Sequence, residues 1–129
     1  MVSKRIVSIV TICFGMAAAA AQADERPLKG PEIDALISGN TVTGQNINGI
    51  WKQFFNVNGE TIYVAPEKPP SYGEWNLQGD KFCSKWPPSD HYVCYVVTGD
   101  LDAKPKMITW IAGGSGAKYP GTVAVGKGL

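Results

Sequence analysis

A glycine-rich stretch near the C-terminal end of the sequence, GGSGAKYPG over residues 113–121, combines a hydroxyl group with a cation. A phosphate-binding P-loop is only weakly supported, because that motif needs Gly-Lys-Ser/Thr at the start of a helix. A glycine-rich loop can approach a narrow cleft closely, where a hydroxyl and an ammonium would engage carboxylates. A flexible hairpin turn is the favoured alternative. The residues that would carry a binding or inhibitory role are Ser115, Gly116, Lys118, Tyr119 and Lys127.

Catalytic chemistry finds little support in the remaining residues. His91 is the single histidine, so paired-histidine metal sites and Cys–His relays lack a second member. Ser115 lies in Gly-Gly-Ser-Gly-Ala rather than in the Gly-x-Ser-x-Gly elbow of a hydrolase. The glutamates are scattered, and spacing alone nominates no glycosidase pair. We therefore predict no catalytic residue, no metal ligand and no cofactor.

Aromatic residues are the other informative feature, with tryptophans at positions 51, 75, 86 and 110. A small β-domain needs large side chains to fill its interior, and aromatic rings can also line a ligand cavity. Alternation along the strands predicts that Trp51 and Trp110 lie in the core. Trp86, beside a Pro-Pro turn, and Tyr72, after a run of prolines, are the candidates for exposed ligand contacts, with a core position as the favoured alternative for both.

The first 23 residues are typical of a secretory signal peptide. Lys4 and Arg5 precede an uncharged stretch of 16 residues, 6–21, and Ala21-Gln22-Ala23 offers a cleavage site. The stretch is shorter than the roughly 20 apolar residues that span a bilayer, so we predict cleavage and no membrane anchor. The mature chain, 24–129, is expected to be a single small domain in the periplasm or the medium.

The charge of the mature chain argues against a nucleic-acid partner. Removing Lys4 and Arg5 from the twelve basic residues leaves ten, against eleven acidic residues. The formal charge is then −1, and the sequence has no run of like charges that would attract a polyanion.

Two cysteines remain after the predicted cleavage. An oxidising compartment favours a disulfide between Cys83 and Cys94, and Pro87-Pro88 midway between them suits a turn that brings two strands together. Closing so short a loop contributes roughly 3 kcal/mol in the chain-entropy model. A redox or metal pair is disfavoured, because the spacing is not Cys-x-x-Cys.

Turn signals predict the elements that would position these residues. Residues 30–39 suit a short helix whose apolar face packs on a sheet. Asn58-Gly59 predicts a type I′ hairpin that pairs Phe55 with Ile62 and places Trp51, Phe55, Ile62 and Val64 on one core face. About seven short strands follow, which predicts a mainly β fold: a small antiparallel barrel or a sandwich with one N-terminal helix.

Four segments, ALISGNTVTG, WKQFFNVNGETIY, YGEWNLQGDKFCSKW and HYVCYVV, occur in this order over roughly residues 33–97. Their frame of Gly-x-Trp, Cys-x-x-Trp and a second Cys resembles a family of small exported alphaproteobacterial proteins of unknown function. The resemblance implies export and a disulfide-bonded β fold. It implies no activity.

The segment SGAKYPGTVAVGKG, residues 115–128, resembles the C-terminal motif of inhibitors of c-type lysozyme. That motif is Ser-Gly-x-x-Tyr, a strand and Lys-Gly, carried on a small antiparallel barrel. By this resemblance Ser115 would enter the lysozyme cleft, Lys127 would assist it, and Gly116 and Tyr119 would shape the loop.

Three function classes follow from the sequence. The leading one is an exported, non-enzymatic binding or interaction protein of the bacterial envelope, whose partner is a protein or a small ligand. The alternative is an inhibitor of c-type lysozyme that acts through the loop 113–121. The third is an exported enzyme with an unrecognised site.

Overall fold

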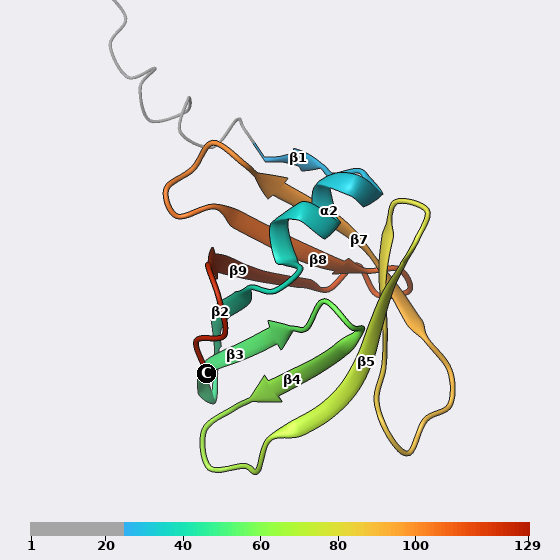
Figure 1. Ribbon diagram of the computed structural model, residues 1–129, viewed down its shortest axis with the longest axis vertical. Coiled ribbons are helices and arrows are strands. Elements are labelled where there is room, and N and C mark those ends of the chain that lie inside the picture. Colours follow the sequence, from blue (N-terminus) through green and yellow to red (C-terminus); the bar gives the residue numbers. More distant parts are fainter. Residues whose placement is uncertain (1–24) are drawn as a thin grey trace, which may run out of the picture.

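The computed structural model describes residues 25–129, so the predicted signal peptide and its cleavage site lie outside the described residues. One short helix and nine strands follow one another along the chain (Figure 1). They are β1 (Arg26–Pro27), α2 (Gly30–Ile37), β2 (Thr41–Asn46), β3 (Gly49–Phe55), β4 (Glu60–Val64), β5 (Ser71–Gln78), β6 (Lys81–Lys85), β7 (Val93–Asp100), β8 (Met107–Ala112) and β9 (Lys118–Ala124).

Strands β2 to β9 form a closed antiparallel barrel. Each strand pairs with the next along the chain, and β9 pairs back with β2, so the sheet of eight strands has no free edge. The short β1 pairs with the C-terminal end of β7. The predicted mainly β fold is confirmed, and of the two expected architectures the barrel is present.

The barrel strand missing from the sequence prediction is β2. Its residues, TVTGQN, contain one large apolar side chain, Val42, and an internal glycine, so they lack the alternation by which strands are recognised. The register with its neighbours explains the glycine. Gly44 lies opposite Trp51, whose ring occupies the space that a side chain at position 44 would take.

Helix α2 packs across one end of the barrel (Figure 1). Ile33, Leu36 and Ile37 are buried, which confirms the predicted apolar face. Glu32 in the first turn forms an ion pair with Arg26 of β1. The helix ends at Ile37, two residues before the predicted end.

The β3–β4 hairpin differs from the prediction by one residue of register. Phe54 pairs with Ile62 and Phe55 with Thr61. Of the turn residues, Gly59 alone has a positive φ, whereas a type I′ turn needs two, so the loop contains one more residue than predicted. Since a shift of one residue reverses the face, Ile62 lies beside Phe54, away from the face that carries Phe55. The predicted core face of Trp51, Phe55, Ile62 and Val64 is therefore wrong for the two β4 residues.

Aromatic rings fill the half of the barrel next to α2. Phe55 is fully buried and contacts three rings: it packs edge-on against Trp75 and Phe82 and stacks with Trp110. The helix residues belong to the same hydrophobic cluster. This core holds the barrel together at the helix end.

The predicted disulfide is confirmed. Cys83 of β6 and Cys94 of β7 lie directly opposite each other in the sheet and are bonded. Their neighbours Phe82 and Tyr95 form the next pair and bring their rings together. The disulfide thus joins the two strands at the same level as the aromatic interior.

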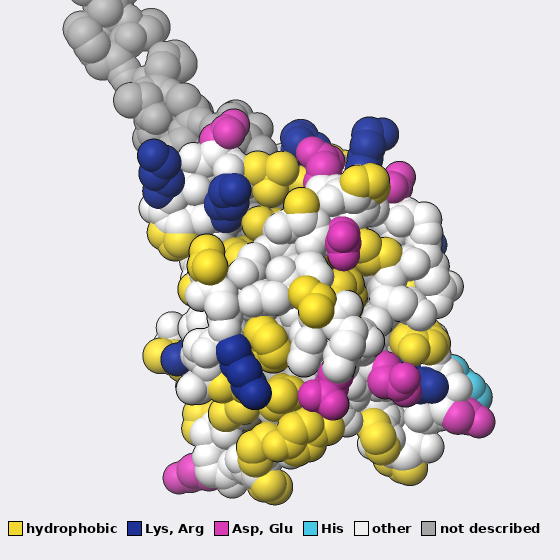
Figure 2. All heavy atoms as spheres, in the orientation of Figure 1, with side chains coloured by type: hydrophobic (Ala, Val, Ile, Leu, Met, Phe, Trp, Pro, Cys, Tyr) yellow, Lys and Arg dark blue, Asp and Glu magenta, His cyan; other side chains and the backbone are white. Residues whose placement is uncertain are grey.

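The outer surface carries interspersed charges. Figure 2 shows basic and acidic side chains mixed across the visible face, with hydrophobic side chains gathered over the part formed by β3, β4 and β5. The visible face has no large area of one sign.

Candidate ligand-binding cavity

A cavity of about 820 Å³ opens at the end of the barrel opposite α2. The β5–β6 turn marks the helix end, because Asp80 in that turn accepts a hydrogen bond from the backbone N–H of Gly30, the first residue of α2. Ser71 and Trp86 lie at the other end of this hairpin, and both line the cavity. One end of the barrel is therefore closed by the helix and the other is open.

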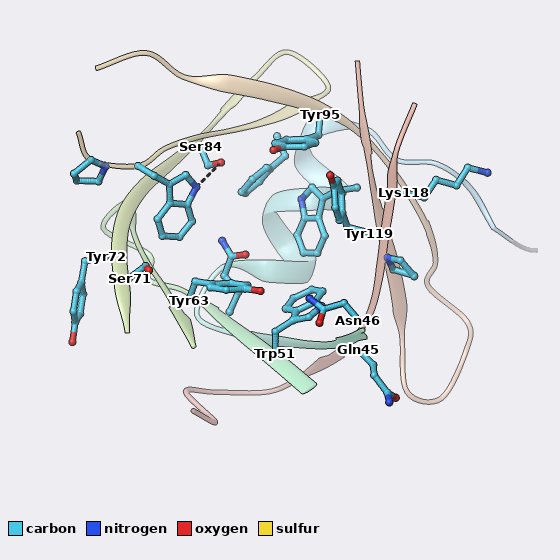
Figure 3. Close-up of a pocket in the computed structure, with 16 residues that line it drawn as sticks. Gln45, Asn46, Trp51, Tyr63, Ser71, Tyr72, Ser84, Tyr95, Lys118 and Tyr119 are labelled. Carbon is cyan, nitrogen blue, oxygen red and sulfur yellow. Dashed lines mark hydrogen bonds between the residues drawn. The ribbon is translucent and has the colours of Figure 1, made fainter. Parts of the chain in front are cut away.

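Aromatic residues make up half of the residues that line the cavity (Figure 3). Phe82 and Trp110, which also belong to the core, lie where the cavity meets the packed half of the barrel. Tyr63 stacks on Trp51 at a ring-centre distance of 5.9 Å and meets Trp86 edge-on at 6.4 Å. The cavity thus offers aromatic faces and edges on several sides.

Tyr95 and Tyr119 line a further part of the wall. Their ring centres are 6.3 Å apart and the rings meet edge-on. In Figure 3 both point toward the interior, from opposite sides to Trp51 and Tyr63. A ligand in the cavity would therefore meet aromatic rings on opposite sides.

Two glycines let tryptophan rings lie against the barrel wall. A Cβ at Gly44 would overlap the Trp51 ring, and a Cβ at Gly73 would lie 2.6 Å from the Trp86 ring. Because any side chain at these positions would push the rings inward, glycine keeps the cavity open.

Neutral polar groups are placed between the rings. Gln53 donates its Nε2 group to Thr61 at 3.0 Å, which leaves its Oε1 oxygen as an acceptor without a donor among residues 25–129. Asn46 accepts the backbone N–H of Asn48 through Oδ1, which leaves its Nδ2 group as a donor. Ser84 accepts from the Trp86 indole at 3.2 Å and keeps its own O–H to donate.

Among residues 25–129, no carboxylate lines the cavity, and Lys118 is the single ionic side chain of the lining. Figure 3 shows Lys118 running away from the interior. Burial raises the pKa of the Tyr63 phenol, and burial together with the neighbouring Tyr119 raises that of Tyr95. Both phenols are therefore protonated at neutral pH and can donate hydrogen bonds.

Trp110 carries an indole N–H that is buried and has no hydrogen-bond partner within the described part of the chain. Most buried polar groups in proteins are paired, so such a donor is unusual. Trp75, the tryptophan outside the cavity, differs in this respect, because its indole donates to the backbone carbonyl of Asn56 at 2.9 Å.

The glycine-rich loop is the turn between β8 and β9 at the open end. Ser115 caps the turn by accepting the N–H of Ala117, and the backbone N–H of Gly116 donates to the carbonyl of Ala112. Lys118 and Tyr119 begin β9 and line the cavity. The loop is thus a hairpin turn beside the mouth of the cavity.

Lys127 is not brought together with Ser115. Its ammonium lies over the ring of Phe54, beside the segment in which Thr41 binds the backbone of residues 126 and 128. That segment follows β9 at the helix end. Since the seven residues of β9 separate the two ends, Ser115 and Lys127 lie about 20 Å apart along the barrel.

Trp86 and Tyr72, the two predicted exposed aromatic contacts, differ in their orientation at the cavity. Trp86 is half-buried, in contact with Tyr63, and contributes to the wall. Tyr72 is 59% exposed and points away from the interior in Figure 3. Trp51 and Trp110 are buried, as predicted, and they also line the cavity.

Sequence reasoning missed the polar residues of the site. Gln53 and Ser84 alternate with core residues on β3 and β6, so a strict two-residue period could have placed them inside the barrel. Asn46 offered no such signal, because it lies at the end of a strand that was not predicted.

Comparisons with known proteins give no match: neither a family model, nor a curated protein, nor a solved structure is found similar to this chain. The two resemblances noted in the sequence therefore stay predictions. Residues 25–129 contain no helix that is long and apolar enough to cross a membrane. In the same part of the chain, no group of three or more His, Cys, Asp or Glu residues is positioned to hold a metal ion.

Proposed function

We propose that this protein is an exported, non-enzymatic binding protein of the bacterial envelope that takes up a small ligand in the open end of its barrel. The observation that carries the proposal is the cavity of about 820 Å³ lined by aromatic rings and neutral polar groups. Its size falls within the range of small-molecule sites, roughly 300–1,000 Å³.

The energetics of the cavity favour occupation by a ligand. Three of the four tryptophans line it, together with four tyrosines, so a ligand would remove a large aromatic area from water. The rings are held by the barrel strands and by contacts with one another. A rigid wall of this kind loses little conformational entropy on binding.

Export is part of the proposal and rests on the signal-like N-terminal sequence. The disulfide between Cys83 and Cys94 is compatible with an oxidising compartment, in which such bonds persist.

Inhibition of c-type lysozyme is less well supported by the geometry. The resemblance assigns Ser115 and Lys127 to one inhibitory surface, but the length of β9 separates them. A lysozyme assay with residues 24–129 in excess addresses this alternative directly. Undiminished lysozyme activity would dismiss it, whereas inhibition that is lost in Ser115→Ala would replace the present proposal.

A fluorescence and thermal-unfolding experiment tests the cavity. Residues 24–129 would be titrated with phenylnaphthylamine, a neutral fluorescent aromatic probe, and with a panel of neutral disaccharides. We expect at least one compound to bind saturably and to raise the Tm, because a ligand that binds only the folded state stabilises it.

Two serine variants make the test specific. Ser71→Phe places a large ring at the cavity wall, whereas Ser89→Phe makes the same change in the β6–β7 turn outside the cavity. We expect Ser71→Phe to abolish binding and Ser89→Phe to retain it. Equal binding by both variants, or no binding of any compound to the parent protein, would contradict the proposal.

A further inference from the structure

We propose that the ligand is a neutral saccharide of one or two rings. This inference deepens the proposed function and rests on it. The cavity combines aromatic rings with fixed donors and acceptors that carry no charge, and this combination suits a ring that has apolar C–H faces and hydroxyl groups at its rim.

The polar groups of the cavity are already oriented by the protein. The hydrogen bond from Gln53 to Thr61 fixes which end of its amide faces away from Thr61, and that end is an acceptor. The backbone N–H of Asn48 donates to the Oδ1 oxygen of Asn46. The Nδ2 group of Asn46 is therefore left as a donor. Ser84 offers a hydroxyl proton, since its oxygen accepts from Trp86. A sugar hydroxyl can serve either kind of partner because it both donates and accepts.

Two tyrosine hydroxyl groups add to the hydrogen-bonding groups of the cavity. The hydroxyl groups of Tyr63 and Tyr95 form no hydrogen bond to any residue between 25 and 129, and both rings line the cavity. Together with the amides they would meet several hydroxyl groups of one ligand. A purely apolar ligand would instead bury these groups without partners, at about 1–3 kcal/mol for each.

A charged ligand is disfavoured by the absence of a facing counter-charge. In the described part of the chain, the lining contains no carboxylate to pair with a cation, and its one cation is Lys118. The Lys118 side chain leads away from the interior (Figure 3). An ionic group taken into the cavity would lose its water without gaining an ion pair, which costs more than burial of a neutral hydroxyl.

Aromatic rings supply the other half of sugar recognition. The face of an aromatic ring is negative and its edge is positive, so C–H groups of a saccharide ring pack favourably on a Trp or Tyr face. Trp51 and Tyr63 present stacked rings on one side, and Tyr119 lies across the cavity from them (Figure 3). A flat sugar ring between these sides would contact rings on both faces.

Isothermal titration calorimetry with cellobiose, maltose and chitobiose tests the inference on residues 24–129. The matched variants are Gln53→Met, which removes the cavity acceptor at nearly constant volume, and Gln78→Met, which makes the same change at the exposed helix end of β5. We expect at least one disaccharide to bind. Gln53→Met should weaken it about tenfold, the loss of one well-placed hydrogen bond, and Gln78→Met should leave it unchanged.

The outcomes separate this inference from the proposed function. If phenylnaphthylamine binds and Ser71→Phe abolishes its binding, while no disaccharide binds or competes, the saccharide inference is overturned and the cavity function stands. If neither class of compound binds, both are overturned. Disaccharide binding that is equally strong in Gln53→Met and Gln78→Met would also overturn the inference. Should Gln53→Met fail to fold, loss of disaccharide binding in Ser71→Phe but not in Ser89→Phe carries the test.

Discussion

Trp75 and Trp110 provide a matched pair for testing how the aromatic interior is stabilised. The two residues are 7% and 5% exposed, and each packs against the rings of Phe55 and Phe82. They differ in hydrogen bonding, because the Trp75 indole donates to the carbonyl of Asn56 whereas the Trp110 indole has no partner within residues 25–129. Trp110 also lines the cavity, whereas Trp75 does not. Replacement of each by phenylalanine removes the same atoms.

The expected difference between the two variants is the net contribution of the Trp75 hydrogen bond plus the desolvation penalty of the unpaired Trp110 N–H, which Trp110→Phe removes. Loss of ring volume at Trp110 enlarges a cavity that is already open, so it acts in the same direction. The carbonyl of Asn56 also accepts the N–H of Gly59, so Trp75→Phe leaves no unpaired acceptor. Trp75→Phe should therefore be less stable than Trp110→Phe by at least about 1.5 kcal/mol. For a domain of this size, 1 kcal/mol corresponds to roughly 4–8 °C in Tm.

Urea unfolding followed by far-ultraviolet circular dichroism measures this difference, with equal m values as the check that both variants unfold from the same state. If Trp110→Phe lost as much stability as Trp75→Phe, or more, the unpaired state of the Trp110 indole in the free protein would be refuted.

Three further predictions concern the frame of the barrel. Replacing both cysteines of the disulfide by alanine should lower the free energy of unfolding by roughly 3 kcal/mol, and the reduced parent protein should show the same loss in denaturant titrations. Gly44→Ala should cost about 1–3 kcal/mol and weaken ligand binding, because the added Cβ displaces the Trp51 ring; unaltered tryptophan emission and affinity would speak against this. Hydrogen bonds and the charge of Arg26 lower the pKa of Glu32 from 4.5 to about 2, so its stabilising contribution is present above pH 4.5 and is lost as the pH falls toward 2. In Glu32→Gln, the free energy of unfolding should fall less than in the parent protein as the pH is lowered from 4.5 to 2. The same fall in both proteins, measured by denaturant titration at several pH values, would contradict this prediction.

The sequence predicts those features of the fold that depend on local chemistry. The helix face follows from the spacing of Ile33, Leu36 and Ile37, and the disulfide follows from two cysteines on either side of a proline turn. The hairpin register was predicted one residue off because a single positive φ at Gly59 selects a longer loop than Asn-Gly suggests. That choice depends on how the two strands twist together, which the dipeptide does not encode.

The cavity could not be predicted from the sequence for a different reason. An aromatic residue that alternates inward in a barrel has the same pattern whether it fills the core or lines an open end. Trp51 and Trp110 show both roles at once, being buried and lining the cavity. What keeps the space open is the pairing of Trp51 with Gly44 across two strands, and the equivalent contact of Trp86 with Gly73. These contacts depend on register, so they became visible only with the barrel.

The central claim, that the open end of the barrel binds a small ligand, is tested most directly by the indole N–H signals in a proton–nitrogen correlation spectrum. The chain has four tryptophans, of which Trp51, Trp86 and Trp110 line the cavity and Trp75 does not. Addition of a ligand that binds in the cavity should shift the signals of those three and leave that of Trp75 in place. A spectrum in which the three cavity signals stay fixed under saturating ligand, or in which the Trp75 signal alone moves, would contradict the account.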